Sequence, residues 1–385
     1  MSSLPSLANV KLDHDGESLW PNILSAEQAA LRAAPTKPRA ECNDPLIGIR
    51  VLGFLLQDLW QHDQHSFGLI PYKRLVKEIA SCLSISGQII PGQSEEEAEA
   101  QYVKLQNLGL HYRNHLIRVF CSNGSPIPEC SDPPSPPSLD VVRDRILGGM
   151  KTPTTAGGAR QIGFLRDGYC CMLTGHYDLV SALRYPEVKD RAAADGVIKT
   201  VTHCADIFSE AAQDGEQKAN YGASVSAVLR MFGLDNAAEN LVGLNVHKPF
   251  NAITMRGDLH TLYDLLNFSL EEVKGEKDKY EIVSIRNEVF GMGIPIPQFV
   301  TFRVDPAVIA TCEMKQIDPP ALPSPSLLAI RAAFSRVAHM SGAAEQVDQI
   351  LRDLEDTPVM AEDGGSAHLL ESRLLQLSCA VSIEA

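Results

Sequence analysis

One short stretch, THCADIFSEA at residues 202–211, contains three side chains of types that bind metal ions or transfer protons. They are His203, Cys204 and Asp206. The surrounding residues 196–210 are rich in β-branched side chains and partly alternate in polarity, which predicts a strand. Successive side chains of a strand point to opposite faces, so Cys204 and Asp206 should share one face and His203 should lie on the other.

A second polar group lies further along the chain, in NAITMRGDLHTLYD at residues 251–264. Asn251 opens a loop or strand, and a helix is predicted from about Asp258. His260 and Asp264 are four residues apart, so they should lie on the same helix face.

Three motifs in this order resemble the HNH nuclease fold, also called the ββα-metal fold. They are RDGYCCMLTG at residues 166–175, ADIF at 205–208 and NAITMRGDLHTLYD at 251–264. In particular, the chain resembles the HNH-domain proteins common in filamentous fungi, over most of residues 45–375. The resemblance implies an α+β fold, with an HNH-nuclease-like ββα core embedded in a mainly helical protein that has helical N-terminal and C-terminal regions.

In that fold a strand His removes a proton from water, an Asn holds a loop or orients that His, and a helix His ligates a metal ion. Matched motif by motif, Asn251 stands at the central Asn and His260 at the helix His. Asp264 stands at the acidic position one turn later. Asp206 stands where the strand His is expected. The resemblance therefore implies Asp206, Asn251 and His260 as catalytic positions and His260, Asp206 and Asp264 as metal ligands.

Asp206 is the departure from the pattern. The ordinary pKa of Asp is about 3.9, against about 6.5 for His, so Asp is a poorer base for water near neutral pH. A carboxylate still suits Mg²⁺, which prefers oxygen ligands. The nuclease site is therefore predicted to be damaged, although its metal position can survive.

Three functions follow from this comparison. The first is an HNH-like scaffold reused as a non-hydrolytic cyclase or isomerase of fungal secondary metabolism. It includes a pericyclase that catalyses an intramolecular Diels–Alder cycloaddition of a hydrophobic small molecule in an apolar pocket, with no metal or cofactor. The alternative is a Mg- or Mn-dependent HNH endonuclease that cleaves nucleic-acid phosphodiester bonds. The second alternative is a non-catalytic interaction protein. The altered strand favours the first.

The same side chains also have structural interpretations. His260 can be a hydrogen-bonded His of an amphipathic helix, and Asp206 can hydrogen-bond within its strand. Cys204 can act as a small buried hydrophobe. Cys170 and Cys171 belong to no CxxC pair, so a structural zinc site is not predicted.

The charge balance bears on partners and compartment. The chain has 34 Lys and Arg against 48 Asp and Glu, a formal net charge of −14, which disfavours binding to nucleic acid. No apolar stretch approaches about 18 residues, so no membrane span is predicted. The nine Cys follow no secretory signal and are predicted to be reduced thiols. We expect a cytoplasmic or nuclear protein, and the oligomeric state is left open.

Helical periodicity predicts helices over residues 45–61, 69–83 and about 94–120. Two Pro-rich segments then divide the rest of the chain. The predicted organisation is a loose leader (1–42), a helical N-terminal domain (43–121), a Pro-rich linker (122–140), an HNH-like ββα core with extra strands (141–317) and C-terminal helices (327–378).

Overall fold

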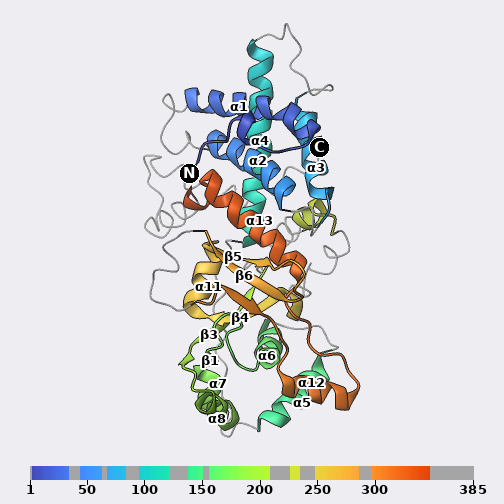
Figure 1. Ribbon diagram of the computed structural model, residues 1–385, viewed down its shortest axis with the longest axis vertical. Helices are drawn as coiled ribbons and strands as arrows, with labels where there is room; N and C mark the ends of the chain where they lie inside the picture. The colour runs from blue at the N-terminus through green and yellow to red at the C-terminus, as the bar shows by residue number, and fades with distance from the viewer. Residues whose placement is uncertain are drawn as a thin grey trace, which may run out of the picture. The chain divides into compact units, whose positions relative to one another are not determined.

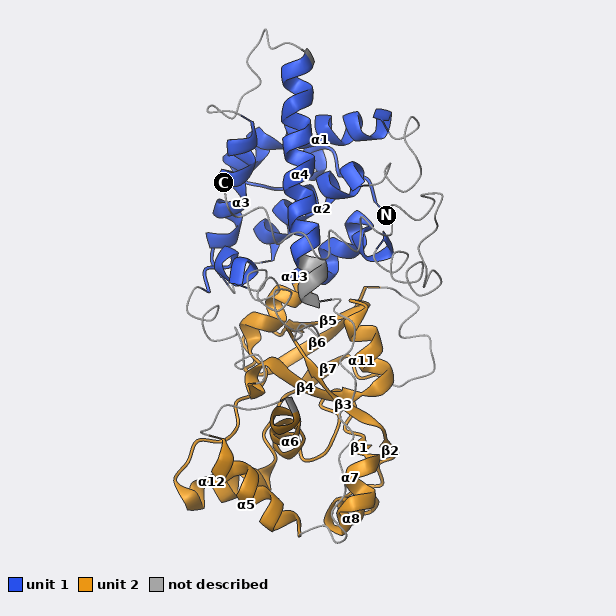
Figure 2. Cartoon of the chain, turned by 180° about the vertical axis from the view of Figure 1, so that it is seen from behind, with its two compact units in different colours: residues 1–121, 213–238, 333–385 blue, residues 122–212, 239–332 orange. Residues whose placement is uncertain are grey.

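The chain is a mainly helical α+β protein with small sheets (Figure 1). The computed structural model describes residues 2–33, 44–62, 67–83, 95–120, 138–150, 156–208, 226–234, 248–285 and 296–346. It divides into two compact units, coloured separately in Figure 2. The first comprises residues 1–121, 213–238 and 333–385, and the second comprises 122–212 and 239–332.

The first unit is helical. Its N-terminal part contains the 3₁₀ turn η1 (Leu7–Asn9) and helices α1 (His14–Ala33), α2 (Asp44–Gln61), α3 (Ile70–Cys82) and α4 (Glu95–Phe120). The predicted helices over 45–61, 69–83 and 94–120 are confirmed as α2, α3 and α4, within one residue at each described end. Most residues of α2 are buried, because its apolar side chains surround the helix instead of forming one stripe.

The backbones of helices α2 and α4 approach closely at Gly48 and Gly109. A Cβ atom on Gly109 would lie 1.8 Å from the carbonyl oxygen of Gly48, and one on Gly48 would lie 2.5 Å from the carbonyl oxygen of Gln106. Neither position has room for a side chain. The two glycines therefore set the distance at which these helices pack.

The expected loose leader over residues 1–42 is wrong for its described part. Helix α1 buries Trp20, Ile23 and Ala26 at helical spacing. Its Glu27 accepts a hydrogen bond of 2.6 Å from Arg50 of α2, and both side chains are buried. The sequence interpretation missed this helix because Pro21 and many polar residues interrupt the apolar pattern. Residues 34–43 lie outside the described part.

The first unit also contains segments from later in the chain. Phe232 follows the helical residues 226–231, and its ring meets those of Phe67 and Phe334 at centroid distances of 4.9 and 5.7 Å. Helix α13 (Pro325–Ser341) crosses the division between the units at residue 332. It ends at Ser341, and the next residue, Gly342, has a φ of +84° that does not continue the helix.

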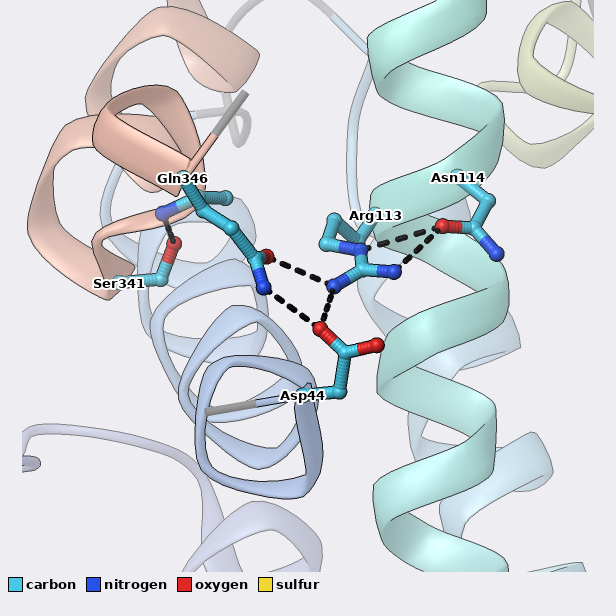
Figure 3. Close-up of polar contacts among 6 residues, drawn as sticks. Asp44, Arg113, Asn114, Ser341 and Gln346 are labelled. Atoms are coloured by element: carbon cyan, nitrogen blue, oxygen red, sulfur yellow. Dashed lines mark hydrogen bonds and ion pairs between the residues drawn. The ribbon is translucent and has the colours of Figure 1, made fainter. Parts of the chain in front are cut away.

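A polar contact connects the last described residues to the start of α2. Asp44 accepts hydrogen bonds from Arg113 Nη1 at 2.6 Å and from Gln346 Nε2 at 2.5 Å (Figure 3). Arg113 also donates to Gln346 Oε1 at 2.7 Å. Three segments distant in sequence are therefore held together by one carboxylate. The remainder of the predicted C-terminal helices, residues 347–378, lies outside the described part.

The second unit mixes short helices with three small sheets. Strands β1 and β2 are parallel, β3 and β4 are antiparallel, and β5, β6 and β7 form an antiparallel sheet. Its elements are α5 (Leu139–Gly149), α6 (Ala156–Arg166), β1 (Tyr177–Asp178), α7 (Leu179–Arg184), α8 (Pro186–Ala194), β2 (Lys199–Thr200), β3 (Thr202–Asp206), η4 (Pro249–Asn251), β4 (Ala252–Arg256), α11 (Gly257–Asp264), β5 (Phe268–Glu272), β6 (Lys279–Ser284), β7 (Phe299–Thr301) and α12 (Pro306–Lys315).

Strands β3 and β4 pair over their full lengths, from Thr202 opposite Arg256 to Asp206 opposite Ala252. β4 continues directly into α11, which packs against both strands. The local order is therefore strand, strand, helix, as the resemblance implies. A specific HNH assignment of this unit remains a prediction.

One difference between the predicted domains and the observed units lies between β3 and β4. The connection between β3 and β4 leaves the second unit, and residues 213–238 belong to the first. No change of composition marks this crossing, so the sequence did not reveal it. Residues 122–137, which are most of the predicted linker, lie outside the described residues. None of the helices in the described ranges is long and apolar enough to cross a membrane.

The contact between α2 and α4 yields a stability prediction. Gly109→Ala should push the helices apart and lower the free energy of unfolding by about 1–3 kcal/mol, as overpacked core positions do. Denaturant unfolding followed by circular dichroism measures the change. Gly148→Ala on α5 is the matched control, because a Cβ there meets no atom within 4 Å. It should be neutral or stabilising by up to about 1 kcal/mol. Equal effects of the two substitutions would contradict the close approach.

Candidate functional site

Two imidazole rings meet where β3 faces α11. The Nδ1 atoms of His203 and His260 lie 3.2 Å apart, and the ring planes are nearly perpendicular, at 85°. Both side chains are partly exposed. This contact joins the strand motif to the helix motif, which are more than fifty residues apart in sequence.

The expectation that Asp206 stands beside His260 is not met, because His203 occupies that place. The strand alternates as predicted, with His203 directed towards α11 and Cys204 towards α6. A Cβ on Gly163 of α6 would lie 3.1 Å from Cys204 Sγ. Asp206 shares the Cys204 face, and its charge adds to the effect of burial in raising the pKa of Cys204 to about 12. Motif alignment alone did not account for which strand face meets the helix.

His260 also contacts a carboxylate on its own helix. Its Nε2 atom lies 3.2 Å from Oδ2 of Asp264, one turn later. The two predicted helix residues therefore lie on one face, as their spacing indicates. The structure brings His260 and Asp264 together with His203, and we call these three residues the relay.

The contacts assign the proton positions when both rings are neutral. The Asp264 carboxylate is an acceptor, so His260 donates from Nε2 and keeps a lone pair on Nδ1. His203 must then donate from Nδ1 to His260. This leaves the lone pair of His203 on Nε2, outside the relay. That atom is the basic end of a chain that runs back to a carboxylate.

The electrostatic setting keeps both rings uncharged near neutral pH. Burial lowers the pKa of His203, and the charge of Arg160 lowers it further, while Asp178 and Asp264 oppose these effects. Burial likewise lowers the pKa of His260, against the opposing effect of Asp264. A neutral His203 can accept a proton, which is the requirement for a general base.

Asn251 lies away from the relay and holds the strands instead. Its side chain is fully buried, with Oδ1 accepting from Phe208 N at 2.9 Å and Nδ2 donating to Phe208 O at 2.8 Å. Its own carbonyl accepts from Ile207 N at 2.7 Å. Asn251, which immediately precedes β4, is therefore hydrogen-bonded to the chain just after β3. This geometry is the loop-fixing role that the resemblance implies.

Arg331 of α13 is a residue that the sequence interpretation missed. Its Nη1 donates to Ile207 O at 2.8 Å, and its Nη2 donates to Tyr263 O at 2.5 Å. Nη2 also lies 3.8 Å from Asp264 Oδ1. The buried guanidinium thus connects the end of β3 to the end of α11. Its signal in the sequence is one charged residue inside the apolar run LLAIRAAF.

Arg166 explains the first of the three motifs. It is fully buried and donates to the carbonyl oxygens of Pro249 and Ala252, at 2.7 and 2.9 Å. It also pairs with Asp167 at 2.6 Å. These bonds attach the end of α6 to the start of β4. The Arg-Asp-Gly sequence therefore supports the strands that carry the site.

The relay as arranged does not fit the Mg²⁺ or Mn²⁺ ion of the endonuclease alternative. Mg²⁺ prefers several oxygen ligands in octahedral geometry. Asp264 is the only carboxylate of the relay, and the two ring nitrogens of His260 contact His203 and Asp264. Asp206, the other predicted ligand, lies on the opposite strand face. In the described part of the chain, no group of three or more His, Cys, Asp or Glu is arranged to hold a metal ion.

Comparison with protein-family models, with curated proteins and with solved structures found no match to the chain. A function for this site therefore has to be inferred from its geometry and from the sequence motifs.

The Asn251 contact predicts a specific loss of stability. Asn251→Ala leaves the buried N–H and C=O of Phe208 without these partners, so the free energy of unfolding should fall by about 2 kcal/mol or more. Urea unfolding measures the fall. Thr261→Ala on the exposed side of α11 is the control and should change stability by less than about 0.5 kcal/mol. A loss no larger than that of the control would show that Asn251 does not hold the strands.

Proposed function

We propose that the second unit contains a general-base site in which His203 activates water to hydrolyse a phosphodiester. The observation that carries the proposal is the relay, with 3.2 Å between the two imidazoles and 3.2 Å between His260 and Asp264. An imidazole with a free Nε2 atom and a hydrogen-bonded Nδ1 atom is suited to accept a proton from water. This proposal is the endonuclease alternative of the sequence analysis, with His203 instead of Asp206 as the base and without an assigned metal.

The proton transfers follow from the hydrogen bonds. His203 Nε2 takes one proton from water as the water oxygen attacks phosphorus, and the leaving oxygen departs and is protonated by solvent. His203 then carries a positive charge while its Nδ1–H donates to His260. Transfer of that proton to His260 moves the charge next to the Asp264 carboxylate. The carboxylate stabilises the imidazolium, because opposite charges interact strongly when partly shielded from water.

The three HNH-like motifs indicate which class of substrate the relay would act on. A base of this kind also suits an isomerase or cyclase that begins with proton abstraction, so the relay alone names a reaction type. The three motifs resemble those of nucleases, and this resemblance supports a phosphodiester substrate. A pericyclic reaction needs an apolar cavity and no proton acceptor. None of the contacts among the described residues supports it, and the cyclase expectation remains an untested prediction.

A hydrolysis assay tests the proposal. The purified full chain is incubated with plasmid DNA and with bis(p-nitrophenyl) phosphate, in EDTA and separately with Mg²⁺ or Mn²⁺. We expect hydrolysis, and we expect His203→Ala to reduce its rate by roughly 10²- to 10⁴-fold, the usual contribution of a general base.

His14→Ala is the matched control, because the His14 side chain is 98% exposed on α1 in the first unit. It should retain the wild-type rate. The proposal is wrong if the wild-type chain hydrolyses neither substrate under any of these conditions. It is equally wrong if His203→Ala hydrolyses as fast as the control.

The pH dependence of the rate tests the relay itself. His203 acts only when neutral, so activity should fall with decreasing pH through its pKa, which burial places below the ordinary value of 6.5. Asp264→Asn removes a charge that raises this pKa, so the acid limb should move to lower pH. The same variant should lose about tenfold or more in maximal rate, because the imidazolium loses its counter-charge. A pH–rate profile with an unchanged acid limb would count against the relay.

A further inference from the structure

We infer that four exposed aliphatic side chains beside the relay bind the alkyl chain of a phosphodiester substrate. They are Leu179, Val180 and Leu183 of α7 and Val201, the residue between β2 and β3. We call these four residues the aliphatic patch. This inference rests on the proposed function, and it names the class of phosphodiester on which the relay would act.

Helix α7 presents three of these side chains on one face. Val180 and Leu183 are three residues apart, and Leu179 and Leu183 are four apart, spacings that place side chains next to one another on a helix. Their exposed fractions are 36% for Leu179, 58% for Val180 and 81% for Leu183. Ser181 and Ala182, on the other side of the helix, are buried. The apolar face of α7 is therefore turned to solvent, which reverses the usual amphipathic arrangement.

Val201 extends this apolar face towards β3. Strands β1 and β2 pair in parallel and end with Asp178 opposite Thr200, so Leu179 and Val201 are the next residues of the two chains. Helix α7 begins at Leu179 and packs against both strands, next to the end of β3 (Figure 1; Figure 2). Val201 is exposed as well. The four side chains therefore belong to one surface where the parallel pair ends.

Hydrogen bonds attach this surface to the strand that carries the base. Asp178, the residue before α7, accepts from N and Oγ1 of Thr202 at 3.2 and 2.8 Å. The carbonyl oxygen of Val201 accepts from N of Gly257, the first residue of α11, at 3.1 Å. Val201 is two residues before His203, which is about 7 Å along a strand. An alkyl chain bound to the patch can therefore reach the base.

The alternation of burial places Val201 and His203 on the same side of the chain. Val201 is exposed and His203 is partly exposed, whereas Thr202 between them is buried. Residues two apart in an extended chain point to the same face. A molecule that covers Val201 thus lies on the side of the chain that carries the imidazole.

The composition of the patch favours an alkyl chain over a nucleobase. Proteins that bind single-stranded nucleic acid stack its bases on aromatic rings in a basic groove, and all four residues of the patch are aliphatic. Single exposed apolar side chains are ordinary, but a group of them on one surface marks a binding site. The net charge of −14 separately disfavours a long polyanion. Both features indicate a single phosphodiester with an alkyl ester group.

A binding experiment tests the patch without the reaction. Isothermal titration calorimetry of the full chain compares dodecylphosphocholine, below its critical micelle concentration, with glycerophosphocholine, a choline phosphodiester that has no alkyl chain. We expect dodecylphosphocholine to bind at least tenfold more tightly. Val180→Asp should weaken its binding at least tenfold, because the alkyl chain would cover a charge. Leu183→Asp, at the most exposed position of the patch, should have the same effect.

Val141→Asp is the matched control, because Val141 on α5 of the same unit is 57% exposed, against 58% for Val180. It should bind dodecylphosphocholine as the wild type does. Equal effects of the two substitutions, or equal binding of the two ligands, would overturn the inference. Analytical ultracentrifugation tests a second copy of the chain as the occupant. A wild-type dimer that Val180→Asp converts to a monomer would assign the patch to self-association and also overturn the inference.

A matched pair of substrates separates this inference from the proposed function. Methyl and dodecyl p-nitrophenyl phosphate differ only in the alkyl group. We expect kcat/KM to be at least tenfold higher for the dodecyl ester, and we expect Val180→Asp, but not Val141→Asp, to remove this preference. If dodecylphosphocholine binding depends on Val180 while no phosphodiester is hydrolysed, the patch stands and the proposed reaction fails. If both esters are hydrolysed equally well, the reaction stands and the patch fails.

Discussion

The antiparallel pairing of β3 with β4 is the constraint on which the site depends. It sets His203 opposite Met255, so that the imidazole side of β3 faces α11 and the thiol side faces α6. A shift of register by one residue would exchange these faces and separate the two imidazoles, because side chains alternate along a strand. The contact of His203 with His260 on α11, and through it with the Asp264 carboxylate, depends on this one register.

Buried polar groups maintain that register. The Asn251 side chain forms two hydrogen bonds with the backbone of Phe208 just beyond β3. Arg331 connects Ile207 to the end of α11. Arg166 attaches α6 to the start of β4. Leaving such groups unpaired in the interior costs free energy, so each contact favours one arrangement of strands and helices over alternatives. Several of the conspicuous motif residues thus support the strands, while the proposed chemistry belongs to the relay.

The acidic net charge of the chain does not exclude the proposed phosphodiester substrate, because a small substrate interacts mainly with the groups at the site. A net charge of −14 disfavours diffuse attraction to nucleic acid. The proposed reaction depends instead on the relay itself, whose two imidazoles have pKa values lowered by burial.

The sequence by itself determined the local features. Apolar spacing predicted helices 45–61, 69–83 and 94–120, and the alternation of β3 correctly separated His203 from Cys204 and Asp206. Helical spacing also paired His260 with Asp264. Such patterns depend on neighbours within a few residues, which is why they are legible in the sequence. Only the tertiary structure decided which face of β3 meets α11, and therefore that His203, not Asp206, joins the relay. It also decided that Arg331 connects the end of β3 to the end of α11, because this contact joins segments whose pairing no local pattern encodes.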